Sequence, residues 1–280
     1  MNPAIEASFE TADGLDLHLG IFPEREAARP PRGVVVLTHG HGEHFRRYLH
    51  VIQAMNAADF AVVAYDLRGH GESDGPRGHC PRFESYLDDL RGVRRIAENR
   101  FPHRPVFLFG HSLGGMITLA GALADPGVRG VLVNAPALRM AYLPPAWKIL
   151  LARVFSRLLP GLAQKTGLAD SALSSDGPFL AALPQPELRH TLMSARLGME
   201  MLTRGARLIA DAGAFRCPVL ITHGEADPVI DPAGSRAFYQ ACGAVEKTLR
   251  TFPGLRHETQ NDAGRDEVIA TWVRWLEARA

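Results

Sequence analysis

The sequence predicts an α/β fold in which a mostly parallel central sheet is covered by helices on both faces, with a helical insertion forming a cap. Short apolar runs alternate along the chain with segments of helical periodicity, as is typical of strands joined by crossover helices. The run Val-Val-Val-Leu at 34–37 has no polar alternation, as expected for a strand buried on both faces. Such a sheet places its site at the carboxyl ends of the strands.

Each element follows from a local pattern. The chain opens with two alternating segments around a turn at 12–14, Ala-Asp-Gly, which predicts a β-hairpin. The predicted strands are 5–11, 15–22, 34–37, 60–65, 106–109, 128–133, 218–222 and 248–252. The predicted core helices are 44–58, 83–99, 116–124, 233–242 and 266–278.

One long segment, 137–212, breaks the alternation of strands and helices. It is rich in Leu and Met, has helical periodicity interrupted by Pro and Gly, and shows no strand pattern. We therefore expect one domain made of a first core part at 1–136, a cap insertion at 137–212 and a second core part at 213–280.

Composition restricts the possible partners. Thirty-one Lys and Arg against thirty Asp and Glu give a formal net charge of +1, which argues against a nucleic acid partner and favours a neutral or lipid-like small molecule. The three cysteines are far apart, which argues against a disulfide framework and a thiolate zinc site. With no signal-peptide pattern and no apolar run of about 18 residues, we expect a cytoplasmic protein. No pattern indicates its oligomeric state.

The most informative motif is Gly-His-Ser-Leu-Gly at 110–114, directly after the predicted strand 106–109 and before a helical segment. This is the G-x-S-x-G turn that presents the nucleophile in α/β-hydrolases. A serine on so sharp a turn needs small neighbours, and Gly110 and Gly114 supply them. We therefore predict Ser112 as the nucleophile. The alternative is a glycine-rich turn with an incidental serine, which its position after a buried strand disfavours.

A serine nucleophile needs a base and an acid, which in this fold follow it in the order acid, then histidine. Asp227 lies in a loop after the predicted strand 218–222, and the following proline fixes the backbone beside it. We predict Asp227 as the acid, with Glu225 and Asp231 as competitors. Only three histidines follow Ser112 in the sequence, so the base must be one of these three.

These three histidines differ in their position. His190 falls in the cap, and His223 lies at the end of a core strand. His257 lies just after the last predicted strand and before the last helix, where it would reach the same edge of the sheet as Ser112. We predict His257 as the base.

The tetrahedral intermediate of such a reaction needs two hydrogen-bond donors at its oxyanion. We predict the backbone amides of Leu113, which follows the nucleophile, and of His41, in the glycine-rich loop after the strand 34–37. The alternative is a metal site at His39, His41 and His44. We expect no metal, because the glycines suit a turned backbone and no set of carboxylates accompanies the histidines.

Five motifs occur together in one order along nearly the whole chain. They are HGHGEH at 39–44 followed by Arg47 and Tyr48, DLRGHGES at 66–73, GHSLGG at 110–115, GEADPVID at 224–231 and HE at 257–258. In these motifs the sequence resembles the monoacylglycerol lipase and lysophospholipase branch of the α/β-hydrolases, a group similar to the serine aminopeptidase S33 (Hydrolase_4) proteins.

The resemblance implies a serine carboxylic-ester hydrolase that cleaves medium- or long-chain acyl esters of glycerol through an acyl-enzyme, without metal or organic cofactor. It also implies that Glu43 and Arg47 lie around the alcohol end of the substrate. The alternatives are a general carboxylesterase or serine aminopeptidase of the same fold, and a ligand receptor that retains the scaffold. Dehalogenases and epoxide hydrolases are disfavoured, because they use an aspartate at the position of Ser112.

The cap contains a predicted amphipathic helix at 146–159, preceded by two prolines. Its apolar face comprises Trp147, Leu150, Leu151, Val154, Phe155 and Leu158. Its polar face comprises Lys148, Arg153, Ser156 and Arg157. One interpretation is that the apolar face is buried on the core. The other is that it lines the acyl entrance or makes transient contact with lipid aggregates or a membrane, which makes Trp147 and Phe155 candidate substrate-binding residues.

Overall fold

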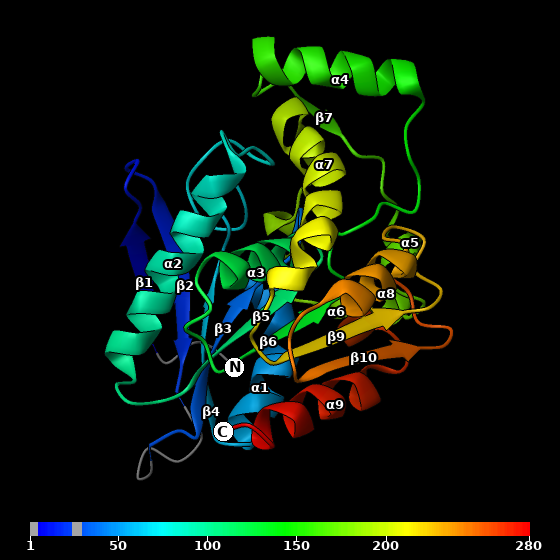
Figure 1. The fold of residues 1–280 in the computed structure, drawn as a ribbon. Coiled ribbons are helices and arrows are strands. Elements are labelled where there is room, and N and C mark those ends of the chain that lie inside the picture. Colours follow the sequence, from blue (N-terminus) through cyan, green and yellow to red (C-terminus); the bar gives the residue numbers. More distant parts are fainter. Residues whose placement is uncertain (1–4, 24–29) are drawn as a thin grey trace.

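The structure is a computed structural model that describes residues 5–23 and 30–280 (Figure 1). Residues 1–4 and 24–29, which belong to the predicted first core part, lie outside the described residues. An eight-stranded sheet has the order β1-β2-β4-β3-β5-β6-β9-β10. The strands are β1 Ile5–Glu10, β2 Asp16–Phe22, β3 Gly33–Thr38, β4 Phe60–Tyr65, β5 Val106–His111, β6 Gly130–Asn134, β9 Val219–Gly224 and β10 Lys247–Phe252.

The sheet is mostly parallel, as predicted. From β4 to β10 every neighbouring pair of strands is parallel, whereas β1 pairs with β2 and β2 with β4 in antiparallel register. The predicted hairpin is therefore the edge of the sheet. Parallel strands end at one edge, and this edge carries the loops in which the site residues are predicted.

Helices cover both faces of the sheet (Figure 1). The core helices are α1 Leu49–Ala57, α2 Phe83–Arg100, α3 Leu113–Ala124, α8 Pro232–Ala241 and α9 Arg265–Glu277. Val34 and Val36 pack into one core with α2, α3 and α8, and Val35 and Leu37 pack into the other with α1 and α9. Neighbouring residues of β3 face opposite sides of the sheet, so a strand inside the sheet must be apolar throughout. The predicted class is confirmed.

The predicted helix 44–58 is partly wrong at its start. Residues Phe45–Tyr48 form a 3₁₀ turn, and the α-helix begins at Leu49. The Phe45 amide donates to Oδ1 of the buried Asp66, at 2.8 Å. This side-chain contact holds the first turn in place, and it joins the residue after the HGHGEH motif to the first residue of the DLRGHGES motif, 21 residues further along the chain.

The segment predicted as a cap lies between β6 and β9. It contains α4 Ala146–Leu158, α5 Asp170–Leu173, α6 Gly177–Ala182 and α7 Ala195–Asp211. The expectation that it lacks strands is wrong, because β7 Ala163–Lys165 and β8 Leu192–Ser194 form a separate antiparallel pair. Strands of three residues are too short to show an alternating pattern in the sequence. The boundaries at 137 and 212 stay predictions.

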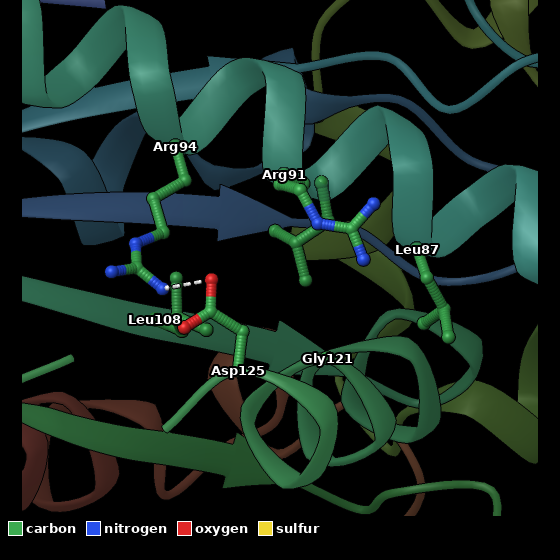
Figure 2. Close-up of a pocket in the computed structure, with 7 residues that line it drawn as sticks. Leu87, Arg91, Arg94, Leu108, Gly121 and Asp125 are labelled. Atoms are coloured by element: carbon green, nitrogen blue, oxygen red, sulfur yellow. Dashed lines mark ion pairs between the residues drawn. The ribbon is translucent and has the colours of Figure 1, made fainter. Parts of the chain in front are cut away.

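Within residues 5–23 and 30–280, no helix is long and apolar enough to cross a membrane. Figure 2 shows a pocket between α2 and α3, spanned by an ion pair of 3.1 Å between Arg94 and Asp125 and floored by Leu108 of β5. None of the predicted site residues lines this pocket.

Candidate active site

Ser112 lies on the sharp turn between β5 and α3. Its backbone has φ 53° and ψ −116°, a conformation that residues other than glycine rarely adopt. A Cβ at Gly110 would lie 2.4 Å from the Gly114 carbonyl oxygen, and a Cβ at Gly114 would lie 2.3 Å from the carbonyl oxygens of Thr38 and His39. Glycine is therefore required at both positions for β5, α3 and the loop after β3 to approach one another.

The structure brings Ser112, His257 and Asp227 into one hydrogen-bonded chain. Ser112 Oγ lies 2.9 Å from His257 Nε2, and His257 Nδ1 lies 2.7 Å from Asp227 Oδ2. All three residues are buried. With a proton on Nδ1 held by the carboxylate, Nε2 is free to accept the serine proton. The arrangement can thus generate a nucleophilic oxygen at Ser112.

Asp227 differs clearly from its two predicted competitors. Its Oδ1 accepts hydrogen bonds from the amides of Val229 and Ile230, at 2.8 and 3.0 Å, which leaves Oδ2 facing His257. Glu225 is exposed on the surface. Asp231 caps the N-terminus of α8, where its Oδ1 accepts from the Ala233 amide at 2.8 Å. Asp231 therefore has a structural role that explains its presence.

Burial, neighbouring charges and hydrogen bonds shift the pKa values of both Asp227 and His257. Burial alone would raise the pKa of Asp227, but the charge of His257 and the hydrogen bonds from His223 and His257 hold that pKa below its ordinary value. Burial opposes protonation of His257, but attraction to Asp227 outweighs it, and Glu258 adds to this. The pKa of His257 is therefore raised above its ordinary value of 6.5.

The two predicted oxyanion donors lie on two segments that adjoin Ser112. Leu113 is the first residue of α3, so its amide has no partner within the helix. A Cβ at Gly40, next to His41, would lie 3.2 Å from Ser112 Cβ, so this loop touches the nucleophile. Within the described part of the chain, neither the Leu113 amide nor the His41 amide donates a hydrogen bond to a backbone carbonyl group of a turn or loop. Both are available for an oxyanion.

Two histidines of the loop after β3, His39 and His41, have their rings in contact with other parts of the protein. Among the described residues, no group of three or more His, Cys, Asp or Glu side chains is arranged to hold a metal ion. The His39 ring accepts a hydrogen bond from the Leu67 amide, at 3.0 Å. The His41 ring packs against those of His70 and His190, which also contact each other.

Glu43 and Arg47 are buried, and their contacts are internal to the protein. Glu43 Oε1 accepts from the Gly40 amide at 2.6 Å and from the Tyr48 hydroxyl at 2.7 Å. Arg47 bridges Glu43 at 3.1 Å and Glu258 at 2.6 Å. This network joins the loop after β3 to the loop that carries His257. It therefore fixes the loop after β3 relative to the predicted base. The position of Glu43 and Arg47 around the alcohol end of the substrate stays a prediction.

Trp147 and Phe155 lie on α4, which packs against α7 at the outer end of the cap (Figure 1). Trp147 is 60% exposed, whereas Phe155 is partly buried. The buried side of α4 contains Ser156 and the partly buried Ile149 and Ala152, so the helix turns most of its apolar face outward. The interpretation that this face is buried on the core is wrong. The packing of α4 against α7 was not indicated by the apolar pattern alone.

One residue at the site was not predicted to contact the triad. His223 Nε2 lies 3.0 Å from Asp227 Oδ2, the oxygen that also faces His257. The sequence did place His223 at the end of a strand, four residues before the acid. That spacing was the available signal, but it does not say which way the ring turns.

Together, the mostly parallel sheet, the strained strand-to-helix turn and the Ser-His-Asp chain define a serine hydrolase of the α/β-hydrolase fold. Residues 29–264 match the family described as serine aminopeptidase, S33 (Hydrolase_4), and the chain belongs to this family.

The chain is also similar to individual proteins of the α/β-hydrolase fold. A monoacylglycerol lipase of Mycolicibacterium smegmatis is 34% identical over 248 residues, covering 88% of each chain. The crystal structure of a monoacylglycerol lipase from Paleococcus ferrophilus superposes with a TM-score of 0.85 at 34% identity, over 94% of this chain and 99% of that one. A monoglyceride lipase variant of Saccharomyces cerevisiae in complex with a substrate analogue has a TM-score of 0.87 at 24% identity, over 100% and 96%, and shares the fold.

Proposed function

We propose that this chain is a serine ester hydrolase of the monoacylglycerol lipase type, which cleaves medium- or long-chain acyl esters of glycerol or of a lysophospholipid. The observation that carries the proposal is the hydrogen-bonded chain from Ser112 through His257 to Asp227, at 2.9 and 2.7 Å. The similarity to proteins named monoacylglycerol lipase supports the choice of substrate class.

In the proposed reaction, Ser112 Oγ attacks the ester carbonyl carbon while His257 Nε2 takes the serine proton. The carbonyl oxygen becomes an anion, which the amides of His41 and Leu113 stabilise. His257 then gives its proton to the alcohol oxygen, which leaves as glycerol. Ser112 is left as an acyl-enzyme.

The second half of the reaction reverses these roles. Water attacks the acyl-enzyme carbonyl while His257 takes a proton from it, and the collapse of the second intermediate releases a fatty acid and returns the proton to Ser112. Asp227 holds the imidazole in the productive orientation and stabilises its cation in both halves. No step requires a cofactor.

Aminopeptidase activity is the second candidate, because the matched family carries that description. An aminopeptidase must hold a charged amino terminus, which calls for an unpaired carboxylate near the nucleophile. The buried carboxylates beside the triad, Glu43 and Glu258, are both paired with Arg47. This pairing favours an uncharged ester.

A substrate panel tests the proposal. Purified protein is assayed on 1-monooleoylglycerol, a lysophosphatidylcholine, p-nitrophenyl acetate and an aminoacyl anilide. We expect release of fatty acid from one of the two lipids with kcat/KM well above that for the anilide. Preference for the anilide would establish the aminopeptidase instead, and labelling by a fluorophosphonate without any turnover would favour a ligand receptor.

The pH dependence of the proposed enzyme follows from the raised pKa of His257. The base must be neutral to accept the Ser112 proton, so the enzyme is inactive below this pKa and active above it. We expect kcat/KM to rise with pH through a single group that titrates above 6.5. A profile of kcat/KM on a soluble ester, measured between pH 4 and 9, checks this, and a rising limb below about pH 5 would exclude His257 as the base.

We propose that the outward face of α4 contacts lipid aggregates. Its exposed apolar side chains are Trp147, Leu150, Leu151, Val154 and Leu158, and Tyr142 and Leu143 lie just before it. The segment 137–169 contains five basic residues and no acidic one, although the whole chain has a net charge of only +1. An apolar face flanked by basic residues is typical of helices that lie in an anionic lipid interface.

Substitutions on α4 separate lipid contact from catalysis. We expect Trp147→Ala to lower activity on monooleoylglycerol in vesicles containing anionic lipid by about tenfold, with less than a twofold change on dissolved p-nitrophenyl acetate. Phe155→Glu should act in the same direction and also lower stability, because Phe155 is partly buried. Equal losses on both substrates would show that α4 only supports the fold.

We also propose a cytoplasmic location. The buried thiols of Cys80, Cys217 and Cys242 are all free, as suits a reducing compartment. Fractionation of the native host, with detection of the protein by antibody, tests this location.

A further inference from the structure

Asp227 is shared by two imidazole rings. Its Oδ2 lies 2.7 Å from His257 Nδ1 and 3.0 Å from His223 Nε2, while its Oδ1 accepts two backbone amides. Both rings and the carboxylate are buried, so no exposed solvent competes for Oδ2. The triad described above uses His257 alone.

The neighbours of His223 determine which of its nitrogens carries the proton. Nε2 lies between two acceptors, Asp227 Oδ2 at 3.0 Å and the Ile230 carbonyl oxygen at 3.1 Å, so Nε2 must carry hydrogen. Nδ1 lies 2.8 Å from the hydroxyl of Ser235, a fully buried residue of α8. In the neutral ring Nδ1 is an acceptor, so Ser235 donates to it.

We propose that His223 is a positioning residue of the hydrolase: it donates from Nε2 to Asp227, withdraws charge from the oxygen that faces His257, and is itself fixed by Ser235. This inference rests on the proposed triad. His223 lies on β9, and Ser235 lies on a helix, so both are held by regular structure, whereas Asp227 lies in a loop. The second ring therefore links a loop-borne acid to the rigid core.

The effect on His257 has a definite sign. Without the donor at His223, Oδ2 has His257 as its single side-chain donor, and more of the negative charge acts on that ring. The protonated form of His257 is then stabilised further, and its pKa rises. Because the base works in its neutral form, activity begins at a higher pH.

Other ionisable groups also face His257 and must stay constant in the test. They are Glu258 in the same loop, Glu43 after β3 with its partner Arg47, and His111 at the end of β5, whose ring centroid lies 4.8 Å from that of His257. None of them contacts His223 by a hydrogen bond among the described residues, so substitution of His223 leaves them in place.

The test compares His223→Leu, His223→Gln and Ser235→Ala with wild type in kcat/KM profiles between pH 5 and 9 on a soluble ester. We expect His223→Leu to move the rising limb up by about one pH unit and to lower kcat about tenfold. His223→Gln keeps an N–H donor and should restore most of both. Ser235→Ala should move the limb in the same direction by a smaller amount.

His79→Leu is the matched control. The wild-type His79 ring forms a hydrogen bond with Ser194 Oγ at 2.9 Å and has no contact with the triad by a hydrogen bond. The rising limb of the His79→Leu profile should therefore stay at the wild-type pH. A folded His223→Leu enzyme with the wild-type limb would overturn the proposal, as would His223→Gln no better than His223→Leu. Should His223→Leu fail to fold, an unchanged profile for Ser235→Ala overturns it equally. If the wild-type protein itself showed no activity on the ester, the proposed function would be refuted instead.

Discussion

Replacing Ser112 with Ala is expected to lower kcat on a monoacylglycerol or a soluble ester by about a millionfold, because the three residues of a triad act as a unit. Only substrate binding and the proposed oxyanion amides of His41 and Leu113 would remain. The substitution removes a single oxygen atom and keeps the Cβ atom of residue 112, so the turn between β5 and α3 should keep its conformation. The circular dichroism spectrum and the melting temperature should stay close to wild type.

Ser156→Ala is the matched control for this variant. Ser156 is equally buried, but its hydroxyl donates only to the Arg153 carbonyl within α4, at 2.8 Å. Its loss should leave kcat unchanged. If Ser112→Ala kept activity near that of Ser156→Ala, the nucleophile would have to be another residue.

Asp227→Asn is expected to lower kcat by about ten-thousandfold with little change in KM. The amide presents an N–H group toward His257 Nδ1 and so favours the imidazole tautomer with its proton on Nε2, which cannot accept the serine proton. Steady-state kinetics on a soluble ester measure the split between kcat and KM.

Asp231→Asn is the control for Asp227→Asn, with the same chemical change four residues away. Asp231 caps α8, and asparagine is as good a helix cap as aspartate, so both activity and stability should be nearly unchanged. An inactive Asp231→Asn enzyme beside an active Asp227→Asn enzyme would mean that the acid has been assigned to the wrong carboxylate.

Much of this architecture could be predicted from local patterns. A strand such as 34–37 must be apolar on both faces in a covered parallel sheet, and the turn at 110–114 needs its glycines for close backbone approach. The order of Ser112, Asp227 and His257 along the chain, each after a strand, was enough to predict that they meet at one edge of the sheet.

The rest depends on side-chain directions that no local pattern contains. The apolar face of α4 was equally compatible with burial and exposure, and contact with α7 decided between them. The resemblance implied that Glu43 and Arg47 lie around the alcohol end of the substrate, but no local pattern indicated that Arg47 pairs with Glu258, 211 residues away in the chain. The second ring on Asp227 depends in the same way on the orientation of His223.

The most direct test of the proposed mechanism is the site of reaction with a fluorophosphonate, which modifies a serine only where a neighbouring base activates it. After incubation of the native protein at pH 8, intact mass and peptide mapping should show one adduct per chain, on Ser112. The adduct should be lost after substitution of His257 or prior heat denaturation. An unmodified protein, or an adduct on a different residue, would contradict the account.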